Sequence, residues 1–229
     1  MPAVKVVHFS DVLCIWALVG QANLYRLVRD LGDQVEVAVH YCSVFPDTRT
    51  KITKAWRDRG GFAGYGDHVK SVADRFDGIA LHPDVWRSVQ PRSSASPHLF
   101  IKAVELLEPH HPAPTAFEAG LSVTAARELR AAFFTKGQDI ANWAVQRQIA
   151  EQIGLDFDEV LQKIETGEAI ALLSADYELA QSLGVQGSPT YILNEGRQKL
   201  FGDVGYRILA ANITELLAQP RDDEASLCR

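Results

Sequence analysis

The sequence Val4-Lys5-Val6-Val7-His8-Phe9, followed four residues later by Cys14-Ile15-Trp16-Ala17, gives the clearest structural signal in the chain. The first run is apolar and largely β-branched, which predicts a buried strand. Apolar residues at helical spacing then extend over residues 16–31, and Gly32 is a typical stop. Cys14 is therefore expected at the point where a strand passes into a helix.

A cysteine at the start of a helix lies among backbone N–H groups that have no partner within the helix. Their partial positive charge favours the thiolate over the thiol, so Cys14 is predicted to be a nucleophile. The redox pattern Cys-x-x-Cys would place a second thiol at position 17, which is Ala17 in this chain. The alternative is a buried structural thiol that packs as a small hydrophobic residue.

Further strands are predicted at residues 35–41, 190–193 and 198–201. The first of them completes a strand–helix–strand unit with parallel strands and a right-handed crossover. The other two flank a glycine-containing hairpin turn at residues 194–197, and an amphipathic helix over residues 204–217 closes the pattern.

The middle of the chain, from about residue 65 to residue 183, has almost no strand signal. Ser96 and Pro97 are expected as the N-cap and first residue of a helix. An exposed loop or short irregular helix is expected over residues 46–66. The predicted helices of the middle region are residues 96–107, 114–135, 139–153, 156–166 and 168–183.

This order of elements predicts an α/β protein, with a thioredoxin-like fold that contains a large inserted helical domain. The thioredoxin-like domain would be discontinuous, formed by residues 1–64 and 168–229. Residues 65–167 would form the insertion. Such an arrangement explains why strand signals occur only towards the two ends of the sequence.

Composition excludes several classes of function. The 229 residues are 47% hydrophobic and 23% charged, as in globular proteins, and the formal net charge is −6. Neither nucleic acid nor an anionic membrane would be attracted over such a surface. No apolar run approaches the roughly 18 residues of a membrane helix, and the N-terminus lacks the pattern of a signal peptide. We therefore expect a cytoplasmic protein.

The three cysteines, Cys14, Cys42 and Cys228, are an odd and widely spaced set. They predict neither a disulfide framework nor a zinc site, and no metal is expected. Cys42 ends the second strand and is expected to be buried.

The run Gly184-Val185-Gln186-Gly187-Ser188-Pro189-Thr190, with the order of elements and the position of Cys14, resembles the DsbA-like superfamily. Residues 10–20 and 133–140 are similar to its FrnE-like branch, in which Cys-Pro-Trp-Cys follows a Ser-Asp lead-in. Ile15 and Ala17 depart from that motif. The resemblance implies a cis Pro189 facing Cys14, a thiol substrate paired with the backbone of Ser188 beside Gly187, and Trp16 as core or pocket wall.

A second run, Leu200-Phe201-Gly202-Asp203, resembles the Phe-Gly-x-Asp of kappa-class glutathione transferases and 2-hydroxychromene-2-carboxylate isomerases. This resemblance implies that Asp203 helps to bind the γ-glutamyl end of glutathione, and a homodimer follows by analogy with the same branch. A residue that caps the last helix is the other interpretation of Asp203.

Three functions remain open on this basis. The first is a thiol–disulfide oxidoreductase that works through Cys14 alone, with glutathione or another small thiol as cosubstrate. The second is a glutathione-dependent transferase or isomerase in which Cys14 is not modified. The third is a family member that binds a thiol or peptide ligand without turnover.

Overall fold

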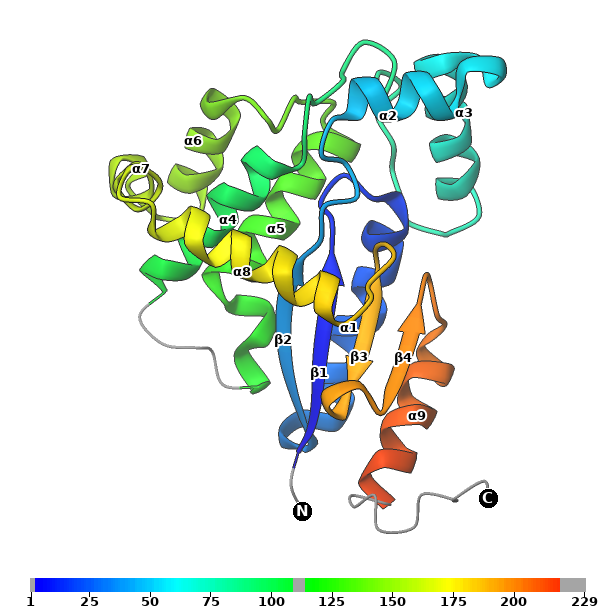
Figure 1. Ribbon diagram of the computed structural model, residues 1–229, viewed down its shortest axis with the longest axis vertical. Coiled ribbons are helices and arrows are strands. Elements are labelled where there is room, and N and C mark those ends of the chain that lie inside the picture. Colours follow the sequence, from blue (N-terminus) through cyan, green and yellow to red (C-terminus); the bar gives the residue numbers. More distant parts are fainter. Residues whose placement is uncertain (1–2, 109–113, 219–229) are drawn as a thin grey trace.

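The computed structural model describes residues 3–108 and 114–218, with a four-stranded sheet in the order β2-β1-β3-β4 (Figure 1). β1 and β2 are parallel, β3 is antiparallel to β1, and β4 is antiparallel to β3. The thioredoxin-like α/β fold with an inserted helical region is thereby confirmed. The strands are β1 (Val4–Ser10), β2 (Val35–Tyr41), β3 (Thr190–Leu193) and β4 (Gln198–Phe201).

The parallel pair depends on the apolar, valine-rich sequence of β1 and β2. Val4 pairs with Val35 and Val6 pairs with Val37 in the register, and Val4, Val6 and Val35 are buried. A parallel pair needs a crossover connection, which α1 (Ile15–Leu31) supplies. Cys14 lies in the loop that connects β1 to α1, between Ser10 and Ile15.

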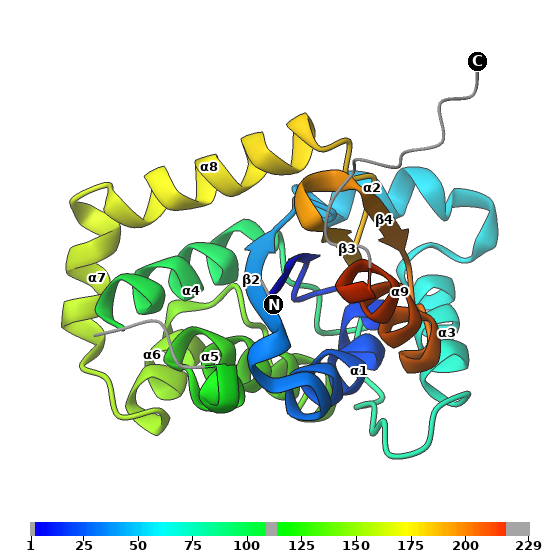
Figure 2. The same cartoon turned by 90° about the horizontal axis from the view of Figure 1, so that it is seen from below.

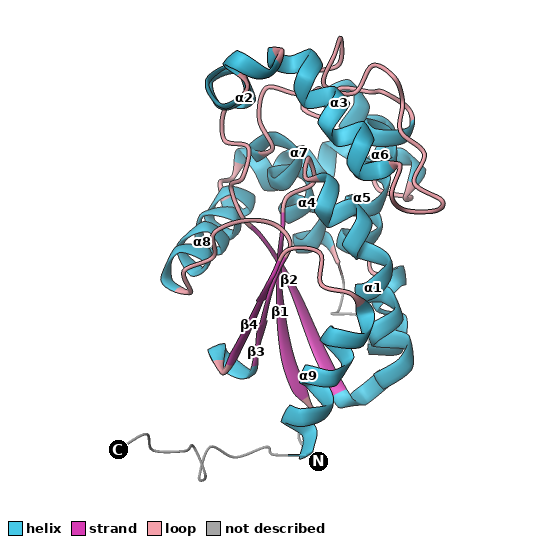
Figure 3. Ribbon diagram, turned by 90° about the vertical axis from the view of Figure 1, so that its right-hand side faces the viewer, coloured by secondary structure: helices cyan, strands magenta, loops and turns pink. Residues whose placement is uncertain are grey.

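Helices cover both faces of the sheet. α1 and α9 (Tyr206–Ala218) share one face, where Leu27 and Leu209 belong to the same buried cluster as Val6. α8 (Glu168–Ser182) covers the other face, where Ala180 packs with Phe9. Figures 2 and 3 show α8 on the side of the strands opposite to α1 and α9.

The helical region extends over the end of the sheet at which β1 and β2 terminate (Figure 1). None of the helices in residues 3–108 and 114–218 is long and apolar enough to cross a bilayer. The remaining α-helices are α2 (Thr48–Ala55), α3 (Gly61–Ala73), α4 (Ala95–Leu107), α5 (Leu121–Arg130), α6 (Trp143–Gln152) and α7 (Phe157–Glu165).

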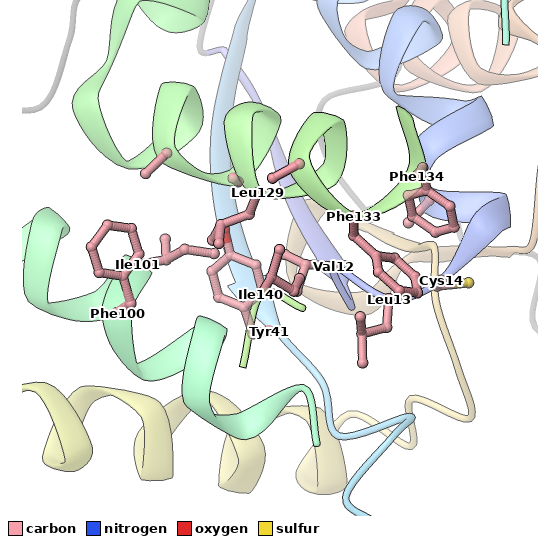
Figure 4. Close-up of a cluster of buried hydrophobic side chains, with 14 of the residues drawn as sticks. Val12, Leu13, Cys14, Tyr41, Phe100, Ile101, Leu129, Phe133, Phe134 and Ile140 are labelled. Atoms are coloured by element: carbon pink, nitrogen blue, oxygen red, sulfur yellow. The ribbon is translucent and has the colours of Figure 1, made fainter. Parts of the chain in front are cut away.

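One hydrophobic cluster joins the helical region to the loop that carries Cys14. Phe100 of α4, Leu129 of α5, Phe133 and Leu13 all belong to this cluster (Figure 4). The insertion and the thioredoxin-like part therefore share a core. The division of the chain at residues 65–167 stays a prediction.

The start of α4 differs from the sequence prediction. Its first helical hydrogen bond runs from the His98 N–H to the Ser94 carbonyl, so the N-cap is Ser94 rather than Ser96. Pro97 is consequently the third helical residue, where its missing N–H still costs nothing. The Ser94 hydroxyl donates to Asp11 at 2.7 Å, and this tertiary contact cannot be predicted from the local sequence.

Two other predicted segments also differ. The helix predicted over residues 114–135 is divided at Gly120, whose backbone is extended, into the 3-10 helix Pro114–Ala119, α5 and a π-helical turn at Ala131–Thr135. Residues 46–66 are more regular than expected. Asp47 caps α2 by accepting a hydrogen bond from the Thr50 N–H, and α3 begins within the same segment.

Candidate functional site

Cys14 occupies the N-cap position of α1 and is buried, with 7% of its surface exposed. Its thiol donates a hydrogen bond to the carbonyl oxygen of Ser188, and the Sγ–O distance is 3.1 Å. The Ser188–Pro189 peptide bond is cis, as the resemblance implied. Figure 4 shows the sulfur at the margin of the hydrophobic cluster, pointing away from Phe133. The first strand–helix junction and the loop before β3 therefore meet at this thiol.

The protonation of Cys14 differs from the sequence prediction. Burial raises the pKa of the Cys14 thiol and outweighs the N–H of Ala17, which lowers it. The negative charge of Asp11 raises this pKa further, and the N–H of Trp16 lowers it. The N–H groups of the first helical turn thus act as expected, but they do not determine the direction of the shift.

Asp11, three residues before Cys14 in the sequence, organises the loop around the thiol. Its own N–H donates to the Ser188 hydroxyl at 2.8 Å. Burial raises the pKa of Asp11 to about 6, while its hydrogen bonds oppose this shift. The carboxylate accepts hydrogen bonds of 2.7–3.1 Å from the N–H groups of Leu13, Val44 and Phe45 and from the Ser94 hydroxyl.

A Cys–His hydrolase is not supported by the surroundings of the buried residue His98. His98 lies 3.8 Å from Asp11, and its Nε2 accepts a hydrogen bond from the Val12 N–H at 3.2 Å. Burial holds the pKa of His98 well below its ordinary value, so the ring is neutral. Its Nε2 lone pair is therefore occupied by the backbone rather than directed at the Cys14 proton.

Trp16 lines the outer side of the site, together with a segment remote in sequence. Its ring meets Phe76 edge-on, with ring centroids 6.3 Å apart. The guanidinium carbon of Arg75 lies 5.6 Å from the centroid of the Trp16 ring. Both residues directly follow α3, and Arg75 is exposed. Trp16 is thus half-buried in the wall of the site, and Arg75 adds a cation that the sequence did not single out.

Asp203 lies beside Pro189 on the α1 side of the site. A Cβ atom added at Gly20 of α1 would be 3.6 Å from Cγ of Pro189 and 3.9 Å from Oδ1 of Asp203. This Oδ1 atom is buried and has no hydrogen-bond partner among residues 3–108 and 114–218. Burial raises the pKa of Asp203, and the charge of Arg75 lowers it. α9 begins at Tyr206, so Asp203 is not its N-cap residue and the capping interpretation is wrong.

Gly187 is held against the neighbouring strand. A Cβ atom at this position would lie 2.9 Å from Cε2 of Phe201, and the Gly187 carbonyl accepts a hydrogen bond from the Thr190 hydroxyl at 2.7 Å. The absence of a side chain therefore allows Phe201 to pack over the loop. A direct contact between Gly187 and a ligand stays a prediction.

Cys42 is a buried free thiol, as expected, and it packs in the cluster under α8 rather than in the cluster that contains Cys14. Its Sγ lies 3.7 Å from the Ser10 carbonyl, and burial raises its pKa. Cys228 lies outside the described residues. Within residues 3–108 and 114–218 no group of histidine, cysteine or acidic side chains is arranged to hold a metal ion.

Comparison with known proteins agrees with this geometry. A family model described as DSBA-like thioredoxin domain matches residues 5–214. A curated relative, the ClpXP adapter protein SpxH of Halalkalibacterium halodurans, is 28% identical over 156 residues, which are 66% of this chain and 47% of that protein. The chain thus spans about half the length of the curated relative it matches.

Several solved structures share the fold. A probable DsbA oxidoreductase, SCO1869 from Streptomyces coelicolor, has a TM-score of 0.70 at 19% identity, covering 94% of this chain and 91% of that one. A 2-hydroxychromene-2-carboxylate isomerase has a TM-score of 0.65 at 17% identity, covering 95% and 98%. The cytosolic disulfide reductase DsbM of Pseudomonas aeruginosa with GSH has a TM-score of 0.61 at 19% identity, covering 94% and 98%.

Proposed function

Because this chain belongs to the DSBA-like thioredoxin domain family, we propose that it catalyses thiol–disulfide exchange through Cys14 alone, with glutathione or another small thiol supplying the second thiol. The observation that carries the proposal is the 3.1 Å contact between the Cys14 sulfur and the carbonyl of Ser188, next to the cis Pro189. Ala17 excludes a resolving thiol one helical turn further on.

Substrate docking activates the thiol in this proposal. In the structure the Cys14 thiol donates its proton to the Ser188 carbonyl. An extended substrate whose N–H pairs with that carbonyl removes the acceptor of the thiol proton. The sulfur then keeps the N–H groups of Trp16 and Ala17, both of which favour the thiolate.

The chemistry has two balanced steps. The Cys14 thiolate attacks one sulfur of a disulfide R–S–S–R′, so that a Cys14–S–S–R bond forms and R′S⁻ leaves and takes up a proton. A glutathione thiolate then attacks the R sulfur, which releases the Cys14 thiolate and gives G–S–S–R. The net reaction reduces one sulfur of the substrate disulfide to the thiol R′SH and oxidises the glutathione sulfur, which ends in the mixed disulfide G–S–S–R.

Two opposite charges lie next to residues that neighbour the thiol, Asp203 near Pro189 and Arg75 over Trp16, and they favour a small zwitterionic cosubstrate. The Asp203 Oδ1 has no partner among the described residues and suits an ammonium group, and Arg75 suits a carboxylate. The γ-glutamyl end of glutathione carries both groups on one carbon atom. Trp16 supplies an apolar wall that Arg75 contacts. A fold-level likeness to DsbM with GSH is consistent with this choice.

A glutathione-dependent transferase or isomerase is the second candidate function. The raised pKa of Cys14 favours it, because a protonated Cys14 would leave the glutathione sulfur as the reacting thiolate. Ser188 and Asp203 would bind glutathione, and an electrophilic small molecule would lie under the helical region. A third candidate is ligand binding without turnover, in line with the adapter role in the name of the relative SpxH. A homodimer and a cytoplasmic location stay predictions.

A glutathione-disulfide reduction assay on matched serine variants tests the proposal. We expect Cys14→Ser to abolish activity and Cys42→Ser to keep it, because Cys42 packs in a different cluster. Full activity in Cys14→Ser would refute the monothiol mechanism. An isomerase or transferase assay on the same protein tests the second candidate. That candidate would be supported if Asp203→Asn lost this activity while Cys14→Ser kept it.

A further inference from the structure

A small, partly open cavity lies between α1, the first two strands and α5. Its volume is about 30 Å³, and its polar lining is formed by His8, Gln21, Tyr25, Tyr41 and Arg130. A guest the size of one water molecule requires roughly 10–15 Å³ of such space. The cavity therefore has room for about two guests of that size, or for one somewhat larger ion.

Arg130 brings a positive charge to this cavity. Only 6% of the residue is exposed. Its guanidinium donates to the side-chain oxygen of Gln21 at 3.0 Å and to the Ser10 hydroxyl at 2.7 Å, both of which are neutral acceptors. The Nε–H is buried without a partner among residues 3–108 and 114–218. A buried cation that lacks an opposite charge is strongly unfavourable.

Two acidic residues on the packed elements, Asp11 and Glu128, are engaged elsewhere. The Asp11 carboxylate is saturated by three backbone N–H groups and the Ser94 hydroxyl. Glu128, on the same helix as Arg130, pairs with Arg127 and accepts a hydrogen bond from Gln152. Across the described part of the chain, no carboxylate forms an ion pair with Arg130.

His8 contributes a second unpartnered polar atom to the same cavity. The residue is 5% exposed, and its Nδ1 is buried without a hydrogen-bond partner in the described residues. Its ring stacks against Tyr191, with ring centroids 4.6 Å apart. Burial and the charge of Arg130 lower the pKa of His8 to about 3, so the imidazole is neutral. A neutral imidazole can carry its proton on Nδ1 and donate it to an acceptor in the cavity.

We propose that this cavity binds one small inorganic anion of chloride size, held by the Arg130 Nε–H and the His8 Nδ1–H. An anion satisfies both unpartnered atoms and also neutralises the guanidinium, whereas a water molecule satisfies the atoms only. The volume of about 30 Å³ suits a monatomic anion better than an oxyanion such as sulfate. The site is separate from the thiol chemistry, since neither Arg130 nor His8 contacts Cys14.

Crystals of the wild-type protein grown in sodium bromide test the site directly. We expect one anomalous-scattering peak in the cavity, within contact distance of Arg130 Nε and His8 Nδ1. A cavity that contains only an atom without anomalous signal, which would be water, overturns the proposal. This measurement does not depend on any variant being able to fold.

Urea unfolding gives a second test in solution. We expect the midpoint for the wild type to be higher in sodium chloride than in sodium gluconate of equal ionic strength, because gluconate is too large for the cavity. Arg130→Met should lose this difference. The control Arg127→Met, one turn earlier on α5 and partly exposed, should keep it. An equal midpoint in the two salts for the wild type would contradict the proposal.

Discussion

The sulfur of Cys14 lies 3.1 Å from the carbonyl oxygen of Ser188, although 174 positions separate the two residues in the sequence. The contact joins the first helix to the loop before β3, and it is the point at which an incoming thiol or disulfide would meet both. It also means that the free protein holds Cys14 as a hydrogen-bond donor. The reactivity of the Cys14 sulfur therefore depends on which group replaces its hydrogen bond to the Ser188 carbonyl.

The pH dependence of alkylation should show that the Cys14 thiol is protonated when it donates to the Ser188 carbonyl. Burial and the charge of Asp11 raise its pKa, so we expect the alkylation rate of the free protein to reach half its maximum above the pH typical of an exposed cysteine, about 8.5. Asp11→Asn should shift the profile to lower pH, because it removes a negative charge. The measurement uses iodoacetamide and a Cys42→Ser, Cys228→Ser background, and a midpoint well below 8.5 would contradict the expectation.

Asp11 itself should leave a signature in the pH dependence of stability. Its pKa in the folded state, about 6, is raised above the ordinary value of 3.8, so the folded state binds more protons between these values. The contribution of Asp11 to stability is therefore present at low pH and is lost as the pH rises from about 4 to about 6. We expect the unfolding free energy of the wild type, minus that of Asp11→Asn, to decrease over this window. An increase would show that the ionised carboxylate is the preferred folded form.

The Ser188 hydroxyl should stabilise the loop through Asp11. Ser188→Ala leaves the buried Asp11 N–H without its acceptor, which should lower the unfolding free energy by about 1–3 kcal/mol. Ser182→Ala, at the exposed end of α8, is the matched control and should change stability by less than about 0.5 kcal/mol. Equal urea midpoints for the two variants would show that the hydrogen bond from the Asp11 N–H to the Ser188 hydroxyl does not stabilise the loop.

Arg75 and Asp203 should govern binding of the small thiol rather than the chemical step. We expect Arg75→Met and Asp203→Asn each to raise KM for glutathione by roughly threefold to tenfold, with kcat nearly unchanged. KM should also rise as the pH falls through the raised pKa of Asp203, because protonation removes the negative charge that attracts an ammonium group. The exposed Lys70→Met on α3 serves as the control. A change in kcat alone would argue against a binding role.

Restoring the missing thiol should change the mechanism. Ala17 is buried, and its N–H faces the Cys14 sulfur one helical turn away. We expect Ala17→Cys to form an internal disulfide on mild oxidation, seen as a loss of about 2 Da and of two titratable thiols, and to lessen the need for glutathione. Ala22→Cys, on the exposed side of α1, should keep its thiols free. A persistent requirement for glutathione in Ala17→Cys would contradict this expectation.

The strands were predictable because their signals are local. Alternating or continuous apolar runs defined Val35–Tyr41, Thr190–Leu193 and Gln198–Phe201 with the bounds that the structure shows. Helix ends in the middle region were less accessible to sequence reasoning. Ser94 rather than Ser96 occupies the N-cap position of α4, and its hydroxyl donates to Asp11, 83 positions away in the sequence, instead of capping the helix.

Two parts of the site could not have been found by reading along the chain. Arg75 lies just past α3 and meets Trp16 only because α3 folds back over the start of α1. The helix-end argument for Cys14 omitted burial, whose effect on the pKa exceeds that of the N–H groups. The Ser-Asp sequence before Cys14 pointed to Asp11 as a residue that affects the pKa of Cys14. Whether Asp11 raises or lowers that pKa could be decided only from the structure.

The mass of the protein after incubation with oxidised glutathione tests the central claim most directly. The account predicts one adduct of about 305 Da on Cys14, absent in Cys14→Ser and removed by added reduced glutathione. A wild-type protein that stays unmodified at Cys14 while it turns over a glutathione-dependent substrate would contradict the account.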